Sequence, residues 1–220
     1  MAISKEDFVK KIDELYKLNE AKTKEYSEKL YFIVNGDDWS FIIKLVAIIE
    51  STLTKLLLEK SGDVNFTKFF ESVSVSRKID LLFELELCSL EGKNFIKYLL
   101  KLRNKLAHDP NELDFNFADY INELDKNQKN ELLQSINIAK NNEYKDSYKK
   151  LLFNDTKVAI WINILPLLLA LDFTRETLKM EKEVLEISTA KSEEILKNII
   201  PELFINTSIE MEKIVGKNGT

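Results

Sequence analysis

The chain has 220 residues, of which 45% are hydrophobic and 31% charged, with a formal net charge of −5 and an isoelectric point near 5.2. This balance is that of an ordinary globular protein, and the acidic charge argues against broad, non-specific coating of nucleic acid. Only 5 Gly and 3 Pro are available for turns, which predicts long helices and an all-α fold. A single cysteine excludes an internal disulfide framework and favours a reducing, cytoplasmic setting.

Apolar residues recur at the spacing of an α-helix through the first half of the chain. Ser4 can cap the first of these helices, and the run Asn35-Gly36-Asp37-Asp38 separates it from the second. Pro110 must end the fourth near His108, because proline disfavours helical geometry in the residue before it. The predicted helices are at about 5–32, 39–60, 76–87 and 91–108.

The second half begins with a polar stretch, residues 111–150, that predicts surface loops and short amphipathic helices at about 119–124 and 129–139. Two long helices are predicted after it, at about 158–180 and 192–215, separated around Ile187-Ser188-Thr189 and bent at Pro201. The apolar run 158–173 is too short and interrupted for a membrane span of ~20 residues. It predicts a buried core helix kinked at Pro166. Charged residues soon after Met1 predict that there is no signal peptide and no membrane partner.

The only histidine, His108, lies five positions after one of only three arginines, in the run Arg103-Asn104-Lys105-Leu106-Ala107-His108. The other 29 of the 32 basic residues are lysines, so an arginine here indicates planar, multi-donor bonding. A helix places Arg103 in the middle of an apolar side, where a charge is costly unless it is paired or used. That side is formed by Phe95, Ile96, Leu99, Leu100, Leu102, Leu106 and Ala107.

This arginine and histidine suit chemistry on a phosphodiester. A guanidinium can hold a phosphate by two parallel hydrogen bonds, and an imidazole can move a proton near neutral pH. The alternative is structural: Arg103 could bridge helices by bonding carbonyl groups or Glu50, and His108 could cap its own helix end. One His and one Cys are too few to form a zinc site, so no metal is expected.

A row of lysines runs down the opposite side of the same helix, at positions 93, 97, 101 and 105. Lys101 and Lys105 are candidate RNA-binding residues in a local basic site, and the alternative is an ordinary solvated helix face. Tyr98 lies on this side and is interpreted as a surface residue whose ring lies along apolar neighbours. Cys88, in a Leu-rich run, is interpreted as a small core residue.

The stretch from about Trp39 to Pro110 resembles the HEPN superfamily. The signature of that family is an Arg, four to six residues and a His, commonly with a polar residue after the Arg. Arg103, Asn104 and His108 stand at these positions. Residues 48–57 look like the acidic, Leu-rich second helix of the family, and residues 76–82 look like the short helix before the motif helix, as in mannitol-repressor-like members.

The resemblance implies one all-helical domain over residues 1–220, a HEPN-like helical bundle. Its HEPN-like core would be residues 1–112, with residues 113–220 forming additional C-terminal helices packed on the core. Family members are usually homodimers, and the active ones are metal-independent endoribonucleases with two copies of the motif at the dimer interface. The implied partners are RNA and an antitoxin or regulatory protein, the implied setting is a toxin or phage defence, and no cofactor is expected.

In this interpretation each motif residue has a role. His108 takes or relays the proton of the ribose 2′-OH, Arg103 stabilises charge on the phosphate, and Asn104 holds the histidine or the phosphate. Glu50, on the margin of an apolar helix face, would orient Arg103. The alternative that stays open is a non-catalytic HEPN-like binding or regulatory module.

Overall fold

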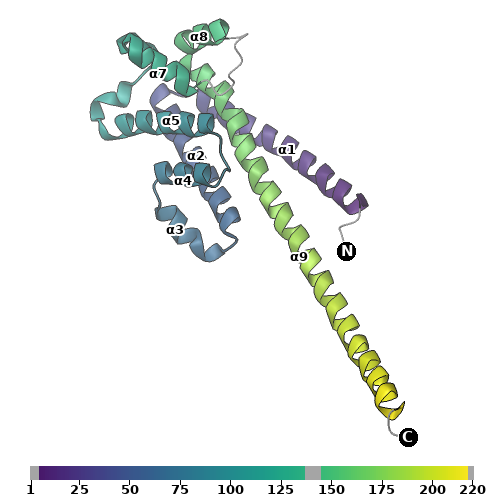
Figure 1. Ribbon diagram of the computed structural model, residues 1–220. Coiled ribbons are helices and arrows are strands. Elements are labelled where there is room, and N and C mark those ends of the chain that lie inside the picture. The colour runs from purple at the N-terminus through teal and green to yellow at the C-terminus, as the bar shows by residue number, and fades with distance from the viewer. Residues whose placement is uncertain (1–4, 137–144, 218–220) are drawn as a thin grey trace. The chain divides into compact units, whose positions relative to one another are not determined.

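The computed structural model describes residues 5–136 and 145–217, and its described side chains are those of residues 9–136 and 146–190. Helices form almost all of these ranges and no strand occurs in them, which confirms the all-α prediction (Figure 1). The α-helices are α1 Lys5–Val34, α2 Asp38–Ser61, α3 Thr67–Ser72, α4 Val75–Glu84, α5 Leu90–His108, α6 Phe117–Glu123, α7 Lys126–Ile136, α8 Lys145–Asn154 and α9 Thr156–Lys217. Two short 3-10 helices, η1 Val64–Phe66 and η2 Pro110–Asp114, join them.

The four helices predicted in the first half are confirmed to within a few residues as α1, α2, α4 and α5. Side-chain caps explain where they begin: Asp37 accepts a hydrogen bond from the backbone of Ser40, and Ser89 accepts one from that of Gly92. The last residue of α5 is His108, as Pro110 requires. The cap predicted at Ser4 lies outside the described residues.

The second half differs from the prediction, because α9 is one continuous helix where two were expected. Ser188 and Thr189 are only mildly unfavourable in a helix, and the hydroxyl of Thr189 bonds to the carbonyl of Leu185 at 2.9 Å. The helix also continues through Pro166, which is exposed next to an exposed Ile162. The carbonyl that a proline leaves without a partner can therefore be solvated there. Helices α3 and α8 were not predicted.

The chain divides into two compact units. One spans Leu15–Leu178 and holds the motif helix. The other is formed by Met1–Glu14 and Lys179–Thr220. Within this second unit, Lys11 Nζ lies 2.6 Å from Glu183 Oε2, an ion pair that joins α1 to α9.

The core of the Leu15–Leu178 unit is an apolar layer between helices. Helix α5 packs against α2, α4 and α7, and the first part of α9 adds a further row of buried side chains. Each fully buried aliphatic residue contributes about 1.5–3 kcal/mol through removal from water. The layer includes Leu45, Ile49 and Leu53 from α2, Ile79 and Leu82 from α4, Phe95, Ile96 and Leu99 from α5, and Ile160, Ile164 and Leu168 from α9.

One described helical stretch, Thr156–Ala190 in α9, is long and apolar enough to cross a membrane by length and composition alone. Half of its most apolar window is buried inside the protein, and core helices of globular proteins pass the same test. Residues 156, 159, 160, 163, 164, 167, 168, 171 and 172 are the buried ones in this stretch. The burial pattern is that of the predicted core helix.

A buried hydrogen-bond network ties α1 and α2 to α9 in this unit. The hydroxyl of Tyr26 donates to Asp172 Oδ2 at 2.6 Å and lies 3.3 Å from the hydroxyl of Thr52. Asp172 Oδ1 also lies 3.1 Å from a guanidinium nitrogen of Arg175. Burial, followed by the bond to Asp172, raises the pKa of Tyr26 well above its ordinary value of about 10.

This network predicts a loss of stability in alkali. The folded protein holds the Tyr26 proton more tightly than the unfolded chain does, so this stabilisation is complete below pH 10 and falls as pH rises above 10. Above pH 10, the free energy of unfolding should fall less steeply with pH in Tyr26→Phe than in the parent. We expect the two slopes to differ by about 1 kcal/mol per pH unit. Urea unfolding at pH 9, 10 and 11 measures this slope. The control is Tyr16→Phe, at a tyrosine that is 70% exposed, and an equal change in both variants would contradict the prediction.

The end of α4 contains a strained residue. Glu86 has a φ of 58°, the left-handed region that favours glycine. Its N–H bonds to Phe83 O at 3.0 Å, and the next N–H, of Leu87, bonds to Leu82 O at 2.8 Å. This pair of bonds is the Schellman motif, whose left-handed position is usually glycine.

We expect Glu86→Gly to raise the free energy of unfolding by about 0.5–1 kcal/mol. The gain is the left-handed strain of an L-residue, about 1–2 kcal/mol, less the extra entropy that glycine brings to the unfolded chain. Urea unfolding measures the change. The matched control is Glu84→Gly, in the last helical residue of α4, which should lower stability instead. A loss in both variants would contradict the assigned strain.

Candidate functional site

The C-terminal end of α5, which carries the motif, is held by its neighbours. The indole N–H of Trp39, at the start of α2, donates to the carbonyl of Leu106 at 3.2 Å, one of the carbonyls that a helix end leaves free. The carboxylate of Asp109 accepts bonds from the backbone and side chain of Asn111, at 2.9 and 3.0 Å, and so begins η2 where α5 ends. The motif therefore sits beside a capped turn.

A second set of polar contacts fixes the elements around this end. The carboxylate of Asp38 lies 2.7 Å from Lys157 Nζ and accepts a bond from the backbone N–H of Phe117 at 2.8 Å. Lys157 also donates to the carbonyl of Gly36 at 2.6 Å. These contacts join the beginnings of α2, α6 and α9, so the end of α5 lies on a scaffold rather than on a free loop.

The three motif residues occupy the open side of this end. Arg103 is half-buried, while Asn104 and His108 are exposed. None of the three side chains makes a hydrogen bond or ion pair with any other residue that the structure describes. Ala107, on the same apolar side of α5 as Arg103, is also exposed. No other helix therefore covers this side of α5 at its last turn. Solvent access there is why a charge can occupy an apolar helix face without an internal partner.

Helix geometry separates the two ionisable groups of the motif. Five residues advance by about 7.5 Å along the axis and turn by about 140°. One chain therefore does not place the guanidinium of Arg103 against the imidazole of His108. A phosphate could bridge the two groups, or a second copy of the chain could supply the other half of the site.

Glu50 has a partner other than the one expected. Its Oε1 accepts a hydrogen bond from Lys78 Nζ at 2.9 Å, and no described interaction joins it to Arg103. The ammonium of Lys78, whose side chain is 1% exposed, would be costly without a carboxylate. The sequence signals that Lys78 is buried, since it lies three residues after Val75 and four before Leu82 on the apolar face of α4, but it does not identify the partner.

The four lysines in the row on α5 form ion pairs with carboxylates. The sequence had suggested either a local basic site or a solvated helix face without such partners. Lys93 and Lys97 both bind Asp80 of α4, at 2.9 and 2.7 Å, and their hydrogen bonds lower the pKa of that carboxyl, with Lys97 the larger cause. Lys105 lies 2.7 Å from Glu112, which raises the pKa of the lysine. Lys101 lies 3.1 Å from Glu131 in a pair that is more than half exposed on both sides. Such exposed pairs are weak, so Lys101 remains the most accessible cation of the row.

Tyr98 is buried, with 8% of its surface exposed, where a surface residue was predicted. Its hydroxyl lies 2.7 Å from that of Tyr120 in α6. Burial, followed by this bond, raises the pKa of Tyr98 far above its usual range. The prediction was wrong because α6 and α7 cover this side of α5, and helical spacing alone does not show which sides are covered.

Cys88 is half-buried next to the start of α5, and burial raises the pKa of its thiol to about 11. The thiol is therefore protonated near neutral pH, as expected for a small core residue rather than a reactive nucleophile. A β-carbon added to Gly92 would lie 3.0 Å from Cys88 Sγ and from a methyl of Leu167, so this is a close approach of α5 to α9.

No group of three or more His, Cys, Asp or Glu residues is placed to hold a metal within the described parts of the chain.

Comparison with known proteins adds no relative. No protein-family model, curated protein or solved structure matches this chain. The motif residues and their surroundings are therefore the basis on which a function can be argued.

Proposed function

We propose that this chain is a metal-independent endoribonuclease of the HEPN type, acting as a cytoplasmic homodimer in a toxin or phage-defence setting. The observation that carries the proposal is the state of Arg103, Asn104 and His108. They lie at a capped helix end, and their side chains make no hydrogen bond or ion pair with the described residues. An arginine that serves the fold alone would be expected to bond a carboxylate or carbonyl. This one is available to a phosphate.

The proposed reaction is attack of a ribose 2′-OH on the adjacent phosphorus. His108 takes the 2′-OH proton as the new P–O2′ bond forms, and the P–O5′ bond breaks as the leaving oxygen gains a proton. Arg103 stabilises the charge that develops on the phosphate oxygens, and Asn104 holds the histidine or the phosphate. The products are a 2′,3′-cyclic phosphate and a 5′-OH.

A homodimer follows from the chemistry of this proposal. The chain has one histidine, and the reaction needs both a base and an acid. Two copies of His108 at an interface would share these roles. Lys101, the most accessible lysine of its row, would contact the RNA backbone, whereas Lys105 would first have to leave Glu112.

The test is cleavage of a defined single-stranded RNA by the purified protein in excess EDTA. We expect cleavage to persist and the fragments to carry 2′,3′-cyclic phosphate and 5′-OH ends, as read by end-specific labelling. Sedimentation at tens of micromolar, an order-of-magnitude choice for a stable interface, should show a dimer. A protein that is inert on every RNA tried, or that is only monomeric, contradicts the proposal.

The second candidate is a non-catalytic binding or regulatory module of the same type. The ion pairs of Lys93, Lys97 and Lys105 favour it, since RNA would have to compete with Asp80 and Glu112 for three of the four lysines in the row. In that case the chain should form a dimer and bind a partner without cleaving RNA. An antitoxin or regulatory protein is the partner expected.

A further inference from the structure

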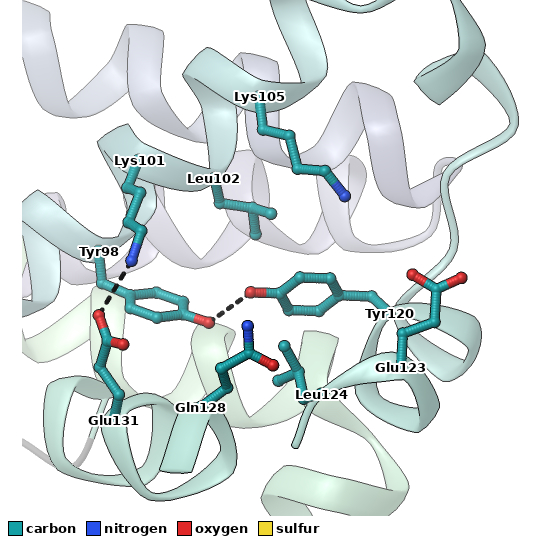
Figure 2. A pocket seen from close by; sticks show the side chains of 9 residues that line it. All are labelled: Tyr98, Lys101, Leu102, Lys105, Tyr120, Glu123, Leu124, Gln128 and Glu131. Carbon is teal, nitrogen blue, oxygen red and sulfur yellow. Dashed lines mark hydrogen bonds and ion pairs between the residues drawn. The ribbon is translucent and has the colours of Figure 1, made fainter. Parts of the chain in front are cut away.

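A pocket of about 430 Å³ lies between α5, α6 and α7 (Figure 2). At about 100° per residue, Tyr98, Lys101 and Lys105 lie on the side of α5 opposite Arg103. Its volume is within the range of about 300–1,000 Å³ that is usual for small-molecule sites. At the ~30 Å³ that one water molecule occupies in the liquid, it has room for about 14 non-hydrogen atoms. Leu102 and Leu124 give it an apolar part, and the rest of its wall comes from two tyrosines and from Lys, Glu and Gln side chains.

The middle of the pocket has hydrogen-bond donors to spare. The hydroxyls of Tyr98 and Tyr120 share one hydrogen bond of 2.7 Å, which uses only one of their two protons. Gln128 is oriented by a capping box: its Oε1 accepts from the backbone of Asp125 at 2.9 Å, and Asp125 accepts from the backbone of Gln128 at 2.8 Å. Its amide nitrogen is therefore the free end, and it points toward the tyrosine hydroxyls (Figure 2). These donors call for a ligand with an acceptor group such as a carboxylate.

The charged side chains around the pocket also favour a ligand with a positively charged group. Lys101 and Glu131 neutralise each other at one end, and Lys105 is neutralised by Glu112. The side chain of Glu123, which also lines the pocket, makes no hydrogen bond or ion pair with any described residue, although its charge helps Glu112 to raise the pKa of Lys105. One wall carboxylate thus remains to bind a positive group.

We propose that this pocket binds a free α-amino acid with an apolar side chain. The carboxylate of the ligand accepts hydrogen bonds from the Gln128 amide and from the one tyrosine hydroxyl proton that the Tyr98–Tyr120 bond leaves free. Its ammonium faces Glu123, and its side chain packs on Leu102 and Leu124. Phenylalanine has 12 non-hydrogen atoms, which fits the volume of about 430 Å³. The proposed ligand contacts do not include Arg103, Asn104 or His108, although Lys101 and Lys105, the lysines that would contact RNA, also line the pocket.

The test is an NMR titration of the full chain with L-phenylalanine and with L-leucine. We expect saturable shifts of the α6 and α7 amides, with a Kd on the order of 1 mM or below for at least one of them. Phenylalanine amide lacks the carboxylate and N-acetylphenylalanine lacks the ammonium, so each should bind more weakly than phenylalanine. No saturable binding of either amino acid by about 10 mM, an order of magnitude above the expected Kd, overturns the proposal.

Variants locate the binding. Tyr120→Phe and Glu123→Gln each remove one ligand contact and should weaken binding about 3- to 10-fold, the usual worth of one hydrogen bond. The matched control is Glu28→Gln, at an exposed glutamate of α1, which should bind like the parent, and so should Arg103→Ala. Because Tyr120→Phe could disturb the packing around Tyr98, Glu123→Gln is the deciding variant. Parent-like affinity in Glu123→Gln overturns the assignment.

Discussion

Replacing His108 or Arg103 by alanine is expected to lower RNA cleavage at least about 100-fold while leaving the fold intact. Loss of a general acid or base costs about 10²–10⁴ in rate, and loss of a charge that stabilises the transition state costs a similar factor. Neither side chain has a hydrogen bond or ion pair to lose within the described residues. Truncation should therefore change the free energy of unfolding by only about 1 kcal/mol or less.

The matched control is Arg77→Ala, the same change at an exposed arginine of α4, which should leave both cleavage and stability unchanged. Thermal melts run beside the cleavage assay separate the two interpretations of the motif. Variants that are folded and inactive support a site, whereas an Arg103→Ala variant that unfolds would show that the arginine clamps helices. Cleavage that survives both substitutions would mean that the proposed chemistry is wrong, whatever the fold does.

The helices around the site were predictable because their signals are local. The apolar repeat of α5 and the proline at position 110 set that helix and its last residue within 20 residues of sequence. The exposure of the motif end was not predictable, because the cover on each side of α5 comes from helices distant in the chain. Tyr98 was misjudged for this reason, since Tyr120 and α7 lie on it.

The ion-pair partner of Glu50 could not be predicted either, because it lies in another helix. Glu50 and Lys78 lie 28 residues apart, in α2 and α4, and a pattern within one helix does not say which opposite charge lies across from it. The continuity of α9 was missed for the converse reason. The polar run around Ile187-Ser188-Thr189 predicted a break, although Ser188 and Thr189 are only mildly unfavourable in a helix and the hydroxyl of Thr189 bonds to the carbonyl of Leu185.

The Glu50–Lys78 pair leads to the largest stability effect that we expect. Glu50→Ala removes the only carboxylate that the structure records beside Lys78, whose side chain is 1% exposed, and leaves a buried ammonium without a partner. Breaking a buried pair in this way costs about 3–5 kcal/mol. The carboxylate end is 39% exposed, so water can reach part of the site and we expect about 3 kcal/mol. That is a large share of the 5–15 kcal/mol by which a domain is usually stable.

The reverse substitution should behave differently. Lys78→Met keeps the length and apolar stem of the side chain, removes the buried charge, and leaves Glu50 at a position that water can solvate. Replacing buried ionic groups by apolar ones of similar size is often neutral, so we expect a change of about 1 kcal/mol or less. The double variant Glu50→Ala/Lys78→Met should recover most of the stability that Glu50→Ala loses, as measured by urea unfolding at pH 7. If instead both single variants lose the same amount, the energy lies in the attraction between the charges rather than in the cost of an unpaired buried cation.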